Sequence, residues 1–277
     1  MKFALCNEVL AHLPFEEQCR AAAALGYAAL ELAPYTVFED PARASDDDAR
    51  AIARTAAAHG LSISGLHWLL VRPEGLSITS ADRAVHARTV AFMRRLVALA
   101  AVMGARYLVH GSPKQRAPAP GQSLGDALAR ATEAFARAGD AARDAGVVYC
   151  VEPLSADQTP LVNTLEEAVA LVRNAGSDGL RTMLDTSSAG LAESEPVPDL
   201  VRRWMPGGLG AHVQHNDPTR RAPGQGAMAF GPILAALEET GYAGEIAVEP
   251  FDYVPDGMGS AAYAIGYLNG LVQARRG

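Results

Sequence analysis

The fold is decided by the stretch from Gly208 to Phe251, GLGAHVQHNDPTRRAPGQGAMAFGPILAALEETGYAGEIAVEPF. Its pattern predicts a strand, a polar loop, a helix, a tight turn and a second strand, which is the repeating unit of a parallel α/β protein. The two strands end in side chains that can bind a metal ion, Gln214 and Glu249. These positions matter because the carboxyl ends of parallel strands build the site in such proteins.

The same unit recurs along the chain as an alanine-rich amphipathic helix, a glycine and a short β-branched or aromatic strand. Its copies end at Leu32, His67, Gly111, Pro153, Asp185 and Phe251. The glycine suits a helix end that closes with a left-handed residue, since glycine has no Cβ to clash there. Together with strands at Lys2–Cys6 and Leu209–Gln214, the pattern predicts eight strands.

Eight amphipathic helices are predicted beside these strands, and Thr164 and Glu167 have the spacing of a capping box. The helices are Phe15–Leu25, Asp46–His59, Ser80–Met103, Ser123–Ala145, Thr164–Asn174, Val197–Trp204, Phe230–Thr240 and Ser260–Ala274. This alternation predicts a single (β/α)8 barrel domain over residues 1–277. A doubly wound open sheet is disfavoured, because no GxGxxG follows the first strand and no break in composition divides the chain.

Composition and charge exclude several classes of protein. Apolar residues make up 49% of the 277, enough for a large core, and the net charge of −7 argues against a nucleic-acid partner. The longest apolar run, Leu96–Met103, is far shorter than the roughly 20 residues that span a bilayer. Cys6 and Cys150 lie in strand-like apolar runs and are expected to be buried thiols. Three cysteines without metal or redox spacing favour a reducing cytoplasm.

Four oxygen-bearing side chains follow four successive strands, namely Glu152, Asp185, Gln214 and Glu249. Carboxylates that point into a barrel mouth would be desolvated and would repel one another, and a divalent cation removes both penalties. An all-oxygen set favours Mg²⁺ or Mn²⁺, with Zn²⁺ or Co²⁺ left open. The alternative is that each acid bonds separately to loop backbone or arginine.

The motifs YLVHGSPKQR (107–116), VEPL (151–154), MLD (183–185), residues 212–234 and GYAGEIAVEPF (241–251) carry a family resemblance. The chain resembles the xylose isomerase-like TIM barrel superfamily of sugar isomerases and epimerases over essentially its whole length. This superfamily includes the tagatose/psicose 3-epimerases and the hydroxypyruvate isomerases. The resemblance implies Glu152, Asp185, Gln214 and Glu249 as metal ligands. His212 is the alternative on the seventh strand, two residues away on the same face.

The resemblance also implies a chemistry that needs no organic cofactor. A divalent metal would bind the carbonyl and hydroxyl oxygens of a ketose, an aldose or a small hydroxy-keto acid and would stabilise the enediolate. Glu152 and Glu249 would act as general base and acid. A metal-dependent sugar or inosose dehydratase is the alternative on the same fold. A homo-oligomer is left open.

Further residues are expected to touch the substrate. His67 and His110 end the third and fourth strands, Trp68 could form an apolar wall against a sugar, and the resemblance favours Arg220. The charges of Lys114, Arg116 and Arg221 are expected to be solvated in loops.

Two positions depart from the family pattern: Gln214 stands where a His is usual on the seventh strand, and the second follows Asp185. Where related enzymes often have a substrate-binding histidine, three residues after Asp185, this chain has Ser188, which is expected to contact the substrate there. The departure motivates one more alternative, a sugar-binding relative that has lost turnover.

Overall fold

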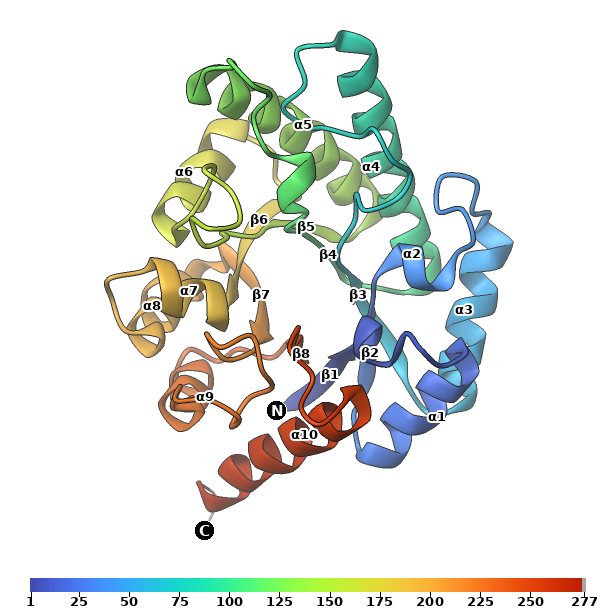
Figure 1. Ribbon diagram of the computed structural model, residues 1–277, viewed down its shortest axis with the longest axis vertical. Coiled ribbons are helices and arrows are strands. Elements are labelled where there is room, and N and C mark those ends of the chain that lie inside the picture. The colour runs from blue at the N-terminus through green and yellow to red at the C-terminus, as the bar shows by residue number, and fades with distance from the viewer. Residues whose placement is uncertain (276–277) are drawn as a thin grey trace.

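The computed structural model describes residues 1–275, and the last two residues of the predicted domain lie outside that part. The described residues include eight parallel strands that close into one barrel, in the order in which they occur along the chain (Figure 1). They are β1 (Lys2–Cys6), β2 (Ala29–Leu32), β3 (Ser62–Leu66), β4 (Tyr107–His110), β5 (Val148–Val151), β6 (Leu180–Asp185), β7 (Gly210–His215) and β8 (Glu245–Val248). The predicted (β/α)8 barrel is confirmed.

The barrel closes because β1 pairs with both β2 and β8. Two register relationships matter for the site. Asp185 at the end of β6 is paired with Gln214 on β7, and Gln214 is paired with Ala247 on β8. Glu249 directly follows β8, and its backbone N–H donates to the carbonyl of His215 at 3.2 Å. The polar residues that end these strands are therefore held at nearly the same height in the barrel.

Helices surround the barrel in Figure 1, and the eight predicted helices are present with bounds shifted by at most three residues. They are α1 (Phe15–Leu25), α3 (Asp46–Ala58), α4 (Arg83–Met103), α5 (Leu124–Ala145), α6 (Leu165–Ala175), α8 (Val197–Trp204), α9 (Phe230–Glu239) and α10 (Gly257–Ala274). The capping box of Thr164 and Glu167 is confirmed, and Gly26, Gly104 and Gly146 close their helices in the left-handed conformation.

Short helical segments that the sequence pattern did not predict are found in the connections. They are η1 (Asn7–Leu10), α2 (Pro34–Val37), η2 (Pro113–Gln115), α7 (Thr186–Ala192) and η3 (Pro206–Gly208). Except for η3, each follows the carboxyl end of a strand, the rim of the barrel at which the long loops lie. These segments are too short to show a helical period, which is why the apolar pattern does not reveal them.

The core lies between the strands and the surrounding helices, and the three cysteines belong to the buried interior as free thiols. This confirms the prediction for Cys6 and Cys150. Within residues 1–275, no helix combines the length and the apolarity that crossing a membrane requires.

Candidate functional site

A small pocket opens at the carboxyl ends of the strands. Its walls come from residues that follow β3, β4, β5, β6, β7 and β8, so one rim of the barrel builds it. The lining residues are His67, Trp68, Gly111, Ser112, Pro113, Glu152, Leu154, Gln158, Asp185, Ser188, Arg220, Glu249 and Phe251. The pocket thus brings together seven of the predicted site residues.

The floor of the pocket carries three carboxyl groups. Glu152, Asp185 and Glu249 each place one oxygen within 4.8 Å of the others, and all three side chains are buried. Such spacing is compatible with a shared cation, because ligand oxygens around Mg²⁺ or Ca²⁺ lie about 2.0–2.6 Å from the ion. Within residues 1–275, these carboxyls do not bond separately to arginine or to loop backbone, except that one oxygen of Asp185 accepts the N–H of Ser188.

The electrostatics of these three carboxyl groups favour the binding of a cation. Burial, and then the charges of Glu249 and Asp185, raise the pKa of Glu152 well above its usual range. Burial also raises the pKa of Asp185 to about 6 and that of Glu249 to about 8. Without a cation, the state in which all three carboxyls are ionised is therefore unfavourable. A bound divalent ion would favour that ionised state.

The carboxylate of Glu152 occupies space that only glycine leaves free. A Cβ at Gly111 would overlap Oε2 of Glu152. The backbone carbonyl of Glu152 accepts a hydrogen bond of 2.7 Å from Arg116, which also donates to the carbonyl of Val162. The prediction that Arg116 is a solvated loop charge is wrong, because its side chain is only 1% exposed and holds the loop after β5.

Asp185 serves two purposes at the end of β6. Its Oδ1 accepts the backbone N–H of Ser188 at 2.7 Å and thereby caps α7. Its Oδ2 is buried without a hydrogen-bond partner in the described part of the chain. A buried carboxylate oxygen without a partner is costly unless something else, such as a cation, satisfies it.

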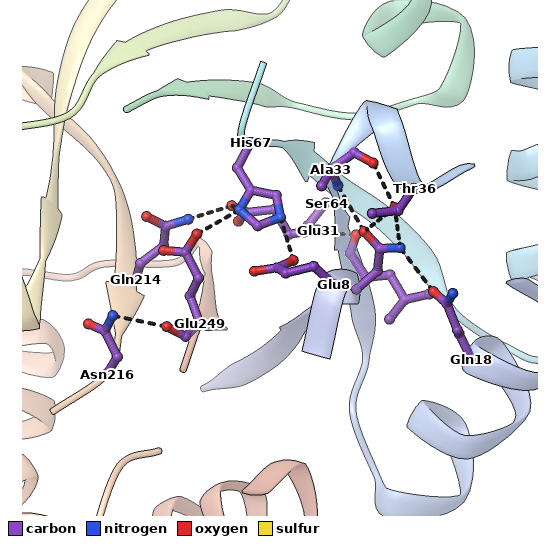
Figure 2. A network of polar contacts seen from close by, with 12 residues as sticks. Glu8, Gln18, Glu31, Ala33, Thr36, Ser64, His67, Gln214, Asn216 and Glu249 are labelled. Carbon is purple, nitrogen blue, oxygen red and sulfur yellow. Dashed lines mark hydrogen bonds and ion pairs between the residues drawn. The ribbon is translucent and has the colours of Figure 1, made fainter. Parts of the chain in front are cut away.

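Glu249 is held from the side by His67 (Figure 2). Nδ1 of His67 lies 2.8 Å from Oε1 of Glu249, and Nε2 lies 2.9 Å from Oε2 of Glu8. Burial opposes a charge on His67, but its neighbours Cys6, Glu8 and Glu249 raise the pKa of His67 well above its usual value. Both nitrogens of this predicted substrate contact therefore face carboxylates of the protein.

Gln214 does not line the pocket but lies beside it, in register with Asp185. Its Nε2 donates a hydrogen bond of 2.7 Å to Glu31, and its Oε1 is buried without a partner among the described residues. His212, the alternative ligand, lies one inward-facing position earlier on β7. Its ring stacks on Tyr107, with centroids 3.8 Å apart, and its Nε2 lies 2.9 Å from Glu31.

Backbone strain is concentrated at the pocket. The described residues other than glycine have positive φ at only four places, and Trp68, Ser112 and Arg220 are three of them, with φ of 50°, 40° and 68°. Such conformations cost about 1–3 kcal/mol each and cluster at functional sites. The carbonyl of Arg220 accepts the backbone N–H groups of Phe251 and Asp252 at 2.8 Å, which holds the strained loop in place.

His110, a predicted substrate contact, is not among the residues that line the pocket. Its Nδ1 lies 2.7 Å from the hydroxyl of Tyr149, and its ring packs edge-on against Phe135. Burial and the nearby Arg116 lower the pKa of His110 to about 3.

Four residues that shape the site were not among the predicted site residues, namely Glu8, Glu31, Gly111 and Gln158. Glu31 is the last residue but one of β2, so its place near the rim could be inferred from the sequence. Glu8 lies in the short helix η1, and Gly111 and Gln158 lie in loops, so only the folded geometry shows the role of these three residues.

The barrel and its acidic pocket define a (β/α)8 protein with a candidate metal centre at the carboxyl rim. A family described as "Xylose isomerase-like TIM barrel" matches residues 19–270, and the chain belongs to this family. The resemblance noted from the sequence is confirmed.

The chain is similar to ketose 3-epimerases. It is 28% identical to D-psicose 3-epimerase of Agrobacterium fabrum over 83% of this chain and 76% of that protein. It is 30% identical to L-ribulose 3-epimerase of Mesorhizobium japonicum over 77% and 69% of the two chains. A crystal structure of D-psicose 3-epimerase in the presence of D-fructose shares the fold, with a TM-score of 0.82, 22% identity, and coverage of 98% and 99%.

Proposed function

We propose that the protein is a divalent-metal-dependent ketose epimerase, which moves a proton at the carbon next to the carbonyl group. The convergence of Glu152, Asp185 and Glu249 in one buried pocket carries this proposal. Oδ2 of Asp185 and Oε1 of Gln214 are buried without hydrogen-bond partners in the described residues. Both oxygens are therefore available to a cation that Glu152 and Glu249 would also hold. The likeness to D-psicose and L-ribulose 3-epimerases supports a ketose as substrate and the third carbon as the reacting position.

The all-oxygen donor set suits Mg²⁺ or Mn²⁺. When bound, such an ion would polarise the substrate carbonyl and stabilise the negative charge that develops on it. The register of Asp185 with Gln214 favours Gln214 over His212 as the strand-seven ligand.

The residues of the chain supply the proton transfer. Glu152 and Glu249 reach the same cavity from β5 and β8, so one can remove the proton and the other can return it to the opposite face of the carbon. Their raised pKa values bring each carboxyl nearer to the pH at which it can both accept and donate a proton. Arg220 and Gln158 supply polar groups for substrate hydroxyls, and Trp68 and Phe251, which pack edge to face, form an apolar wall.

Deuterium exchange tests the proposal. Incubation with ketoses in D₂O and Mn²⁺ should incorporate deuterium at the third carbon and yield the epimer, and EDTA should stop both. Glu152→Gln and Glu249→Gln should each lower the exchange rate by about 10²–10⁴-fold, the usual contribution of a general acid or base. Absence of exchange over a broad ketose panel would contradict the proposal. A product 18 Da lighter would indicate dehydration instead.

A further inference from the structure

Gln214 and Glu31 form a buried pair across the barrel mouth. Nε2 of Gln214 donates to Oε1 of Glu31 at 2.7 Å, and both side chains have no exposed surface. Figure 2 shows the amide turned with its nitrogen toward Glu31 and its oxygen away. The oxygen has no hydrogen-bond partner within residues 1–275.

The direction of this amide decides what it can bind. An amide oxygen can bind a cation, whereas the amide NH₂ group is a donor and cannot. A carboxylate oxygen accepts hydrogen bonds, so Glu31 holds the nitrogen end of Gln214 and leaves the oxygen end free.

Glu31 is itself fixed from the other side. Its Oε2 accepts a hydrogen bond of 2.6 Å from the hydroxyl of Tyr107 and lies 2.9 Å from Nε2 of His212. Glu31 is therefore held in place by contacts other than the one to Gln214.

We propose that Glu31 is a positioning residue for the metal ligand Gln214, because it holds the amide nitrogen and so presents the amide oxygen to the cation. This inference rests on the proposed function and explains how a glutamine can serve in a metal centre. Loss of a partner that orients a metal ligand typically weakens metal affinity by about 10–100-fold.

The test is the affinity of the full chain for Mn²⁺, measured from the free-ion signal in electron paramagnetic resonance. Glu31→Asp keeps the charge but is one methylene too short to reach Gln214, so affinity should fall by about 10–100-fold. Glu245→Asp makes the same change at a buried glutamate at the amino end of β8, away from the ligands, and should leave the affinity for Mn²⁺ unchanged. An unchanged affinity in Glu31→Asp would overturn the inference.

A charge-swapped pair separates positioning from a general structural role. Glu31→Gln alone should weaken Mn²⁺ binding. In the double variant E31Q/Q214E, the new amide can donate to the new carboxylate, whose second oxygen again faces the cation, with the net charge of the pair unchanged. Affinity should recover relative to Glu31→Gln, because the ligand is oriented again. A double variant as weak as E31Q would contradict the inference.

Failure of the proposed function gives a different pattern. If the wild-type chain does not bind Mn²⁺, or if Glu152→Ala leaves binding unchanged, the metal centre and the inference both fail. If Glu152→Ala weakens binding and Glu31→Asp does not, only the role of Glu31 is refuted. Thermal unfolding of each variant without metal checks that the barrel is intact.

Discussion

Nδ1 of His67 lies 2.8 Å from Oε1 of Glu249, so the end of β3 holds a carboxyl group that follows β8. The opposite nitrogen of the ring lies 2.9 Å from Glu8, which follows β1. Three loops of the rim are thereby joined through one imidazole. The contact occupies one oxygen of Glu249 and leaves the other for a cation or a proton.

Replacing His67 should therefore affect the reaction more than substrate binding. His67→Leu removes the contact that orients Glu249 and leaves Glu8 buried without its partner. We expect kcat for epimerisation to fall by about 10–100-fold, as for other groups that orient a metal ligand, with a smaller change in KM. His67→Gln keeps one donor and should retain more activity than His67→Leu. Equal kcat values for the two variants would argue against an orienting role.

A side chain at position 111 should lower the reaction rate by displacing the Glu152 carboxylate. Gly111→Ala would place a methyl group where the Glu152 carboxylate lies, so the carboxylate must move. A displacement of about 1 Å can cost roughly 10²-fold in rate, so kcat should fall by about that factor. Gly125→Ala, where an added Cβ meets nothing within 4 Å, is the matched control and should retain full activity. The measurement is kcat of both variants by steady-state kinetics, and equal kcat values would contradict the prediction.

Metal affinity should rise with pH. Burial raises the pKa of Asp185 to about 6 and of Glu249 to about 8, whereas carboxyls in the unfolded chain titrate near 4. The metal-free fold therefore binds more protons than the unfolded chain between about pH 4 and 8, and its stability falls as pH rises through that window.

A cation must displace these protons, since its ligands bind in the deprotonated form. Calorimetry in buffers of different ionisation enthalpy should show proton release on Mn²⁺ binding, and affinity should increase from pH 6 to pH 8. The gain in melting temperature on adding Mn²⁺ should grow over the same range. An affinity independent of pH would contradict the raised pKa values.

The buried guanidinium of Arg116 should be a stabilising group. Arg116→Met leaves the carbonyls of Glu152 and Val162 without their donor, and each unpaired buried acceptor costs about 1–3 kcal/mol. We expect the free energy of unfolding to fall by about 2–4 kcal/mol in urea titration. Lys114→Met, a neighbouring loop cation, is the comparison and should change stability by less than about 0.5 kcal/mol. Similar losses in both variants would argue against the role of Arg116.

The barrel itself could be predicted from local pattern, because each helix, glycine and strand carries its own period and cap. The carboxyl groups that end β5, β6 and β8 could be predicted for a related reason. Parallel strands in a closed barrel all direct their carboxyl ends to one rim, so Glu152, Asp185 and Glu249 had to meet there if the fold was correct.

The contacts that orient these groups could not be predicted. Glu31 and Gln214 are 183 residues apart, and their hydrogen bond depends on the stagger of the strands, which no local pattern records. Arg116 was misjudged because a charged residue in a proline-rich loop is usually solvated, whereas here two backbone carbonyls compensate its burial. His110 ends β4 and His67 directly follows β3, yet the neighbouring Tyr149 and Phe135 hold His110 among the packed side chains.

The most direct measurement is the anomalous difference density of crystals of the full chain soaked in Mn²⁺. We predict one strong peak about 2.0–2.6 Å from carboxylate oxygens of Glu152, Asp185 and Glu249 and from the amide oxygen of Gln214. A peak elsewhere, for example between Cys6, Glu8 and His67, or no peak at saturating Mn²⁺, would contradict the assignment of this pocket as the metal centre.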